Sequence, residues 1–451
     1  MSSRHADTAP DAVREVVVVQ RPPSWRGTPF SLSYVHLDRE VSGAELLGIY
    51  RWATGQQLEN PRVISPFTME WSSVFHPRFY RAAAGTGATT VRSLEPVEAN
   101  GTDSALQRLW FESVVFLASV TLSAAIVQSR FSSGTLASKY DRLWQAGKFA
   151  STGLVPGLQG QALMDDVSSM ASDSGVSDLE RLLAIRRRFE EVIACLRGPE
   201  SVTEVSLVRR EIPAELGPRF GFLEELRHRL GARLECVIVY GSSVNSEHFA
   251  DYDLVLVAKD PEAVLRKLYA TSPRFSGKEL NVGVYSSDEL WRMQCLSGDN
   301  LADYGLCIYG ETRVPAKSAT DLLMRNLSFG IVRQRQQLGM VGAALADHPL
   351  PGDDRRNLYG YFTKIPANIA KGTFGAMNQR LTKEEVHDWI ESICGFRTTH
   401  MQQLASDGDP GRALAESAVA TGAVLRALNE RFTVVRPHGA TEQGVQPGGS
   451  T

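Results

Sequence analysis

The spacing of apolar positions divides the 451-residue chain into segments of different secondary structure. Residues 15–20 and 30–37 have the Val, Tyr and Ser content of β-strands, and 42–54 fits a short helix with Ser42 as its N-cap. Apolar residues then recur at helical spacing in 104–132, 160–171 and 177–196. The pattern over the first 200 residues therefore predicts a mainly helical region with a few strands. The sequence leaves the role of this region open.

Short apolar runs alternate with helical segments between 201 and 315. The runs have the length and composition of buried strands, at 234–240, 253–257, 280–285 and 305–309. The segments between them fit helices, at 213–230, 261–270 and 287–296. Alternation at this spacing predicts a compact α/β domain.

The remaining chain has a helical pattern from 316 to 435, and 436–451 has the Gly, Pro, Gln and Ser content of a disordered tail. The predicted fold class is thus α/β plus α. An α/β domain at 201–315 is flanked by the mainly helical 1–200 region and by a helical C-terminal domain at 316–435.

Composition narrows the class of protein. The formal net charge is -3 and the pI is near 6.3, which disfavours a nucleic-acid partner. The most apolar stretch, 114–127, is shorter than a membrane span needs and indicates a buried helix instead. Five scattered cysteines without a CxxC pair, and no signal-peptide pattern at the start, favour a reduced, cytoplasmic protein. The oligomeric state stays open.

The segment 236–257, CVIVYGSSVNSEHFADYDLVLV, has the arrangement of a nucleotide site. A buried strand leads directly into Gly241 and Ser242, where a glycine allows a ligand to approach the backbone closely. A helix that begins near Ser243 would direct its free N–H groups toward an anion. These three residues are therefore candidate phosphate-binding residues.

Asp251 and Asp253 lead into the next strand, and residues two apart in a strand point to the same face. Two carboxylates on one face repel each other unless a cation lies between them. Mg²⁺ supplies that charge and keeps coordination positions for phosphate oxygens. The pair is a candidate Mg²⁺ site of the kind that phosphoryl and nucleotidyl transfer use.

This order of strand, Gly-Ser, spacer, Asp-Tyr-Asp and strand resembles the signature of the polymerase-β nucleotidyltransferase superfamily, and most of all its small-substrate adenylyltransferases. The resemblance covers about 213–312. It implies a polymerase-β-like domain with a mixed sheet, in an enzyme that moves a nucleoside monophosphate from an NTP to a small-molecule acceptor and releases pyrophosphate. ATP is the expected NTP. Gly241 and Ser242 would hold its phosphates, and Asp251 and Asp253 would hold Mg²⁺.

One position departs from the family pattern. Where the resemblance implies a third carboxylate, this chain has Asn281, which can ligate a metal through its carbonyl oxygen but cannot act as a base. Glu279 lies two residues away on the same strand face and is the candidate catalytic base. Two alternatives stay open: a degenerate nucleotidyltransferase that binds nucleotide as a sensor or scaffold, and an enzyme that modifies tRNA or protein.

Charged residues elsewhere provide further candidates. Lys364 and Lys371 are seven residues apart, so on one helix they would share a face that could bind the triphosphate, although solvated lysines are the simpler interpretation. Glu384, Glu385 and His248 are other candidate bases. The cluster at 186–188, three arginines, is expected on a solvated helix face.

Overall fold

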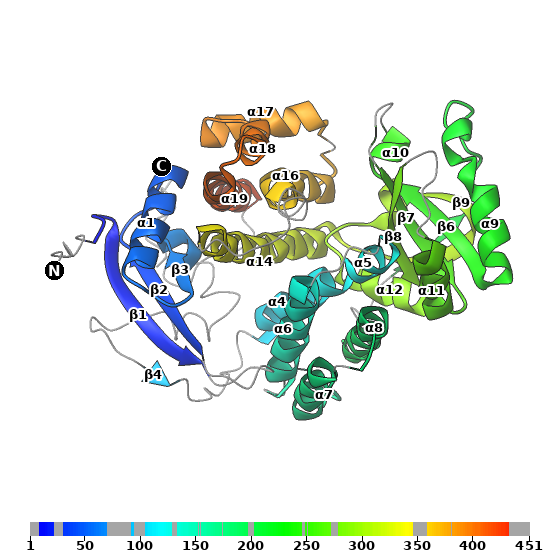
Figure 1. Ribbon diagram of the computed structural model, residues 1–451. Coiled ribbons are helices and arrows are strands. Elements are labelled where there is room, and N and C mark those ends of the chain that lie inside the picture. Colours follow the sequence, from blue (N-terminus) through cyan, green and yellow to red (C-terminus); the bar gives the residue numbers. More distant parts are fainter. Residues whose placement is uncertain are drawn as a thin grey trace, which may run out of the picture. The chain divides into compact units, whose positions relative to one another are not determined.

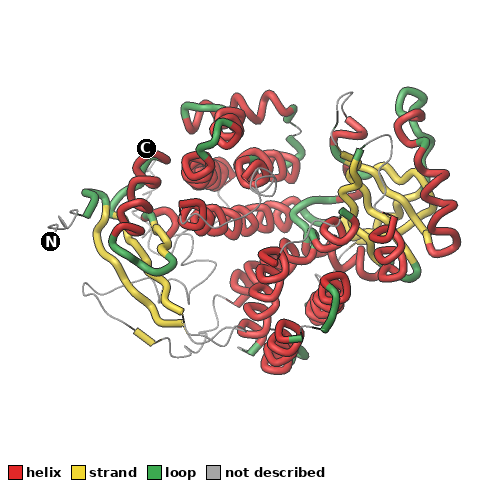
Figure 2. The backbone as a smooth tube through the Cα atoms, viewed as in Figure 1, coloured by secondary structure: helices red, strands yellow, loops and turns green. Residues whose placement is uncertain are grey.

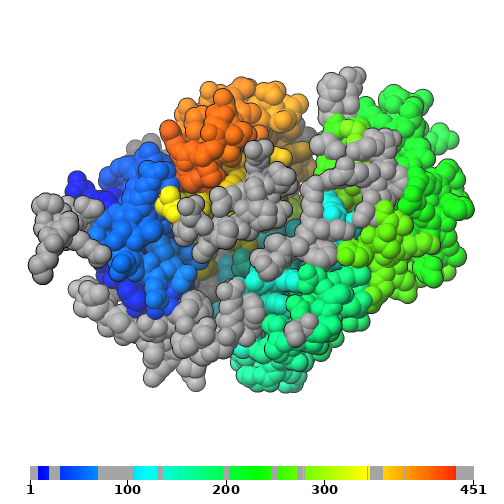
Figure 3. All heavy atoms as spheres, viewed as in Figure 1, coloured from blue at the N-terminus to red at the C-terminus, as the bar shows by residue number. Residues whose placement is uncertain are grey.

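The computed structural model describes most of the chain but leaves several segments out (Figure 1; Figure 2). The described residues are 9–21, 30–69, 92–93, 104–128, 133–151, 153, 155–173, 175–196, 203–245, 249, 251–271, 278–345, 359–379 and 381–432. They divide into two compact units, of which the first takes in the residues up to Trp110 and those from Asn326 onward, and the second is Phe111–Arg325. Figure 3 shows one face of the protein with all its heavy atoms.

The first unit contains a four-stranded sheet in the order β3-β2-β1-β4. Its strands are β1 (Val13–Arg21), β2 (Phe30–Leu37), β3 (Pro61–Ile64) and β4 (Arg92–Ser93). The two N-terminal strands predicted at 15–20 and 30–37 are thereby confirmed, and they pair antiparallel. The helix predicted after them is α1 (Gly43–Gly55), with the expected Ser42 N-cap and a capping box completed by Glu45.

Helices make up the rest of the first unit, in agreement with the pattern after 316. They are α14 (Ala319–Leu345), whose residues up to Arg325 belong to the second unit, α16 (Ile365–Ala376), α17 (Lys383–Cys394), α18 (Thr398–Ser406) and α19 (Pro410–Phe432). The last of them, α19, packs against α1, α16, α17 and α18, so the N-terminal helix α1 is joined to the C-terminal helices. The domain boundaries expected at 200 and 315 stay predictions, and the tail at 436–451 lies outside the described residues.

The second unit contains a five-stranded mixed sheet in the order β5-β9-β6-β7-β8. Its strands are β5 (Thr203–Val208), β6 (Leu234–Tyr240), β7 (Asp251–Ala258), β8 (Glu279–Tyr285) and β9 (Leu306–Ala316). Only β7 and β8 pair in parallel, and the other neighbours are antiparallel. All four strands predicted between 234 and 309 are confirmed, and β5 was not predicted. Mixed strands with helical regions make this a mixed α/β protein, as expected.

Helices alternate with these strands. They are η1 (Gly217–Phe220), α9 (Phe222–Leu230), η2 (Gly231–Arg233), α10 (Ser242–Asn245), α11 (Pro261–Thr271), α12 (Ser287–Leu296) and α13 (Leu301–Tyr304). The single helix predicted at 213–230 is wrong in its first half, which forms turns and a 3₁₀ helix. Pro213, Gly217, Pro218 and Gly221 explain this, because proline and glycine disfavour a continuous α-helix.

The helices α4 (Ser104–Ser119), α5 (Leu122–Val127), α6 (Ser133–Ala150), α7 (Gly160–Ser172) and α8 (Asp178–Cys195) precede this sheet. Side chains from α5 and α8 cover the open edge of β8. Gln128 donates to the Leu280 carbonyl at 3.1 Å, and the Ser123 hydroxyl accepts from the Val284 N–H at 3.2 Å. These contacts occupy polar groups on the β8 edge that another strand would otherwise bind.

One stretch, Ala105–Val127, is long and apolar enough to cross a membrane by length and composition alone. Its 18-residue window is 56% buried within the protein, and Phe111, Val115 and Ile126 are almost completely buried. These contacts agree with the buried helix that the sequence predicts for this part of the chain.

Arg186 corrects the expectation of a solvated arginine cluster at 186–188. Its side chain is 8% exposed and forms ion pairs with Glu190 and Glu289, the second at 2.9 Å. It also donates to the Val284 carbonyl at 3.1 Å, which completes the cover of the β8 edge. Burial raises the pKa of Glu190 to about 8, although the positive charge of Arg186 acts to lower it. The guanidinium therefore joins α8 to the sheet and to α12.

We expect Arg186→Ala to lower the free energy of unfolding by about 1–3 kcal/mol, because it leaves the half-buried Glu289 without its cation and the Val284 carbonyl without its donor. Arg187→Ala is the matched control: its side chain is 54% exposed, and the change should stay within about 0.5 kcal/mol. Urea unfolding of both variants measures the difference. Equal stabilities would contradict the structural role of Arg186.

Candidate functional site

Asp251 and Asp253 open β7 and lie on the same face of it, as the sequence predicts. Both are half-buried, and Tyr252 between them is 1% exposed. Tyr252 points to the other face, where its ring lies 4.7 Å from that of Phe222 and 5.0 Å from that of Phe249. Because the aromatic cluster holds Tyr252 on its side, the two carboxylates are held on the opposite one.

The neighbouring strand β8 adds two polar residues in register. Asp253 is paired with Asn281, and Asp251 with Glu279. The Asn281 amide nitrogen donates to Asp253 Oδ1 at 2.7 Å, so in this arrangement Asn281 is a hydrogen-bond donor. The predicted role of Asn281 as a metal ligand would need its carbonyl oxygen to turn toward the cation. Glu279 occupies the predicted strand position, and its side chain lies outside the described residues.

Gly241 brings the end of β6 against this carboxylate. It has φ +74°, and a Cβ at this position would come within 2.2 Å of Asp253 Oδ2. The site therefore requires glycine for two reasons: the left-handed backbone and the contact. The preceding residue, Tyr240, pairs directly with Asp253 across the strands.

The helix expected near Ser243 begins one residue earlier and is short, α10, with four residues. Ser242 is half-buried at its start. Ser243 is fully buried, and its hydroxyl donates to the Tyr240 carbonyl at 3.1 Å, so that side chain stabilises the turn. The structure describes this loop up to Asn245 and again at Phe249, which leaves His248 outside the described residues.

Two cations that the sequence analysis did not single out lie beside this loop. Arg219 donates to the Ser243 carbonyl at 3.2 Å, and its guanidinium lies 5.6 Å from the Phe249 ring. Lys278, at the start of β8, donates to the Phe249 carbonyl and lies 4.1 Å from the same ring. Arg219 lies far from the motif in sequence, and only the folded chain brings it to the loop. Lys278 directly precedes the candidate Glu279, and this position in the sequence could have identified it as a residue near the site.

Burial dominates the electrostatics of the pair. It raises the pKa of Asp253 to about 6, with a smaller contribution in the same direction from Asp251, while the hydrogen bond from Asn281 lowers it. Burial and the nearby Asp253 also raise the pKa of Tyr240, whose ring meets Tyr304 edge to face at 5.7 Å. Asp253 is thus a carboxylate that a cation would stabilise in its ionised form.

The oxygen donors of Asp251 and Asp253 bear on whether the site fits Mg²⁺. No cluster of three or more His, Cys, Asp or Glu side chains able to hold a metal occurs among the residues that the structure describes. Mg²⁺ is commonly held by one or two protein carboxylates, with water and phosphate oxygens completing the octahedron. Two carboxylates on one strand face, one of them with a raised pKa, fit that smaller requirement.

The C-terminal candidates belong to the first unit. Lys364 is the N-cap residue of α16, Lys371 lies within this helix, and both are exposed; their shared face and their nucleotide binding stay predictions. Glu384 pairs with Arg397 at 3.3 Å, and Glu385 accepts from the Thr382 N–H at 2.7 Å. The hydrogen bonds from Thr382 lower the pKa of Glu385, which weakens its candidacy as a base.

No family model, no curated protein and no solved structure matches this chain.

The raised pKa of Asp253 predicts a pH dependence of stability in the metal-free protein. The pKa of Asp253 is about 4 in the unfolded chain. In the folded protein the pKa of Asp253 is raised to about 6. Between these values the folded state binds more protons, so the contribution of Asp253 to stability falls as the pH rises. Urea unfolding from pH 4 to 7 should show this loss, and Asp253→Asn should remove it. The same pH profile for both proteins would contradict the assignment.

Gly241→Ala should destabilise the protein more than alanine at two other glycines. Gly231 has φ +58° and open space around a Cβ, so its alanine variant carries the backbone cost alone, about 1–2 kcal/mol. Gly217 has neither constraint and should change stability by less than about 0.5 kcal/mol. Gly241→Ala adds the contact with Asp253, about 1–3 kcal/mol more. Thermal and urea unfolding of the three variants test this ranking.

Proposed function

We propose that the second unit is a polymerase-β-type nucleotidyltransferase domain. It would move a nucleoside monophosphate from an NTP, with ATP as the expected donor, to a small-molecule acceptor and release pyrophosphate. The observation that carries the proposal is the contact between Gly241 and Asp253, with Asp251 on the same strand face. This contact joins a candidate phosphate-binding turn directly to a candidate cation site.

The charges around the turn support binding of a triphosphate. Gly241 and the half-buried Ser242 form the turn at the end of β6. Arg219 and Lys278 provide positive charge beside the loop. Nucleotide phosphates are stabilised by such backbone and cationic groups together.

The proposed reaction forms a bond between the acceptor oxygen and the α-phosphorus and breaks the bond from that phosphorus to the bridging oxygen of the leaving pyrophosphate. Asp251 and Asp253 would hold Mg²⁺, which when bound neutralises phosphate charge and orients the triphosphate. The acceptor proton needs a base. Glu279 is the candidate, because its strand position is in register with Asp251.

A second candidate function is nucleotide binding without turnover. The hydrogen bond from Asn281 to Asp253 favours it, because this amide occupies one oxygen of a carboxylate that would otherwise be free for a cation. Asn281 also supplies no base. In this case the domain would serve as a nucleotide sensor or scaffold.

Loss of one carboxylate tests whether catalysis takes place at this site. We expect Asp253→Ala or Asp251→Ala to reduce Mg²⁺-dependent pyrophosphate release from NTPs by about 10²–10⁴-fold, because each removes a cation ligand. Asn281→Ala should reduce pyrophosphate release less, by about 10-fold, since it removes a hydrogen bond to Asp253 and not a carboxylate. Glu215→Ala, an exposed acidic residue, is the control.

The assay measures pyrophosphate over a panel of NTPs and acceptors. Unchanged release by Asp253→Ala would refute catalysis at this site. Thermal stabilisation by NTP and Mg²⁺ without pyrophosphate release would instead support the sensor.

A further inference from the structure

Tyr304 is an exposed aromatic residue at the end of the sheet that carries the candidate site. It is the last residue of α13, just before β9, and it is 36% exposed. Leu306 opens β9 opposite Val239, so Tyr304 lies beside the end of β6 that leads into Gly241. Part of an aromatic side chain is therefore open to a ligand at this end of the sheet.

Side chains from neighbouring elements form one row here. Asn281 in β8 pairs with Asp253 in β7, and Asp253 pairs with Tyr240 in β6. Residues directly opposite each other on adjacent strands share a face of the sheet, so Tyr240 lies on the face of the carboxylate. The Tyr240 ring meets the Tyr304 ring edge to face, with 5.7 Å between the ring centroids. The row thus leads from the candidate cation site over Tyr240 to Tyr304.

Two contacts hold the Tyr304 side chain in place. Its ring packs on Tyr240, and its hydroxyl donates a hydrogen bond to Asp299. The Asp299 N–H in turn donates to the Ser297 hydroxyl at 3.1 Å. Burial of the hydroxyl raises the pKa of Tyr304, and the charges of Asp299 and Asp253 act in the same direction. A ring that is already held in this way loses little conformational freedom when a ligand stacks on it.

The two ends of the row differ in charge. Arg219 and Lys278 lie beside the loop that follows Gly241. At the other end, the exposed carboxylate Asp299 lies at the Tyr304 hydroxyl. A triphosphate is attracted to the cations and repelled by the carboxylate, so its favourable place is the Gly241 end. The uncharged, planar part of a nucleotide fits the Tyr304 end.

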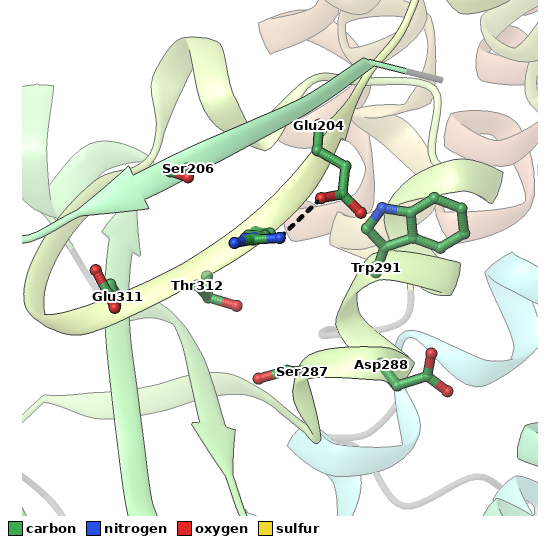
Figure 4. A pocket seen from close by; sticks show the side chains of 8 residues that line it. Glu204, Ser206, Ser287, Asp288, Trp291, Glu311 and Thr312 are labelled. Carbon is green, nitrogen blue, oxygen red and sulfur yellow. Dashed lines mark hydrogen bonds and ion pairs between the residues drawn. The ribbon is translucent and has the colours of Figure 1, made fainter. Parts of the chain in front are cut away.

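A cavity at the other end of β9 suits a nucleotide less well. Carboxylates contribute to its lining from three elements, with Glu204 from β5, Asp288 from α12 and Glu311 from β9 (Figure 4). The cation Arg313 in this lining is paired with Glu204 at 3.3 Å. This part of β9 pairs with β5, beyond the end of β6 that is remote from the candidate site. The cavity therefore offers a triphosphate little compensating charge.

We propose that Tyr304 is the residue on which the nucleobase of a bound NTP stacks. The base lies on the exposed part of the ring, and the triphosphate reaches the turn at Gly241 and the carboxylate pair. Every base has a π-face, so stacking supplies affinity and leaves the choice of base to other contacts. This inference rests on the proposed nucleotide site and holds for either proposed function, transfer or sensing.

Isothermal titration calorimetry of the full-length protein with Mg²⁺ and two probes tests this role. α,β-Methylene-ATP carries the base and cannot release pyrophosphate, whereas tripolyphosphate offers phosphates alone. Wild-type protein should bind α,β-methylene-ATP more tightly than tripolyphosphate. Tyr304→Ala should weaken α,β-methylene-ATP binding about 5- to 100-fold, the range of base–aromatic stacking, and leave tripolyphosphate binding unchanged.

Two variants are controls. Tyr304→Phe keeps the ring and should bind both probes as the wild-type protein does. Tyr361→Ala removes a similarly exposed tyrosine, 39% exposed in the first unit, and should change neither affinity.

The outcomes separate this role from the proposed site itself. A Tyr304→Ala variant that binds α,β-methylene-ATP like wild type, or that loses both probes equally, overturns the role of Tyr304. The nucleotide site stands even then if wild-type protein binds tripolyphosphate and Asp253→Ala does not. If wild-type protein binds neither probe, the nucleotide site and the role of Tyr304 are both refuted.

Discussion

The parallel pairing of β7 with β8 brings Asp253 beside Asn281 and Asp251 beside Glu279. A parallel pair needs a crossover, here α11, and it leaves β8 at the edge of the sheet. The polar groups of that edge have to be satisfied from outside the sheet. Gln128, Ser123 and Arg186 do so. The helices before residue 200 thus stabilise the strand that supplies half of the candidate site.

The same pairing sets the charge state of the site. Asp253 is half-buried, and its carboxylate accepts a hydrogen bond from the Asn281 amide, which favours ionisation but adds no charge of its own. The two carboxylates therefore leave the site with excess negative charge. Arg219 and Lys278, at the loop, balance this charge only in part. A divalent cation would remove the repulsion between Asp251 and Asp253 and the cost of burying the second of them. This is the physical reason for favouring a metal-dependent function over a purely structural one.

The sequence predicted the parts of this arrangement that depend on local pattern. The strands around 236–257 are continuous apolar runs, and the alternation of Asp251, Tyr252 and Asp253 follows from strand geometry alone. It did not predict β5, because TEVSLV is short and mostly exposed and owes its conformation to pairing with β9. Nor did it predict the burial of Arg186, whose partner Glu289 is 103 residues away. Contacts at such separations leave no local signal.

A single glycine allows β9 to serve both ends of the sheet. At Gly310 the backbone has φ +67°, and a Cβ would collide with the Glu235 carbonyl, at 1.8 Å. The register between β9 and β6 shifts beside it, between Val237 and Ile238. Before Gly310 the strand pairs with β6 near the carboxylate site, and after it the strand pairs with β5 and lines the cavity. Any other residue at position 310 would meet both the left-handed backbone and the Glu235 carbonyl, so the passage of β9 from its pairing with β6 to its pairing with β5 depends on glycine here.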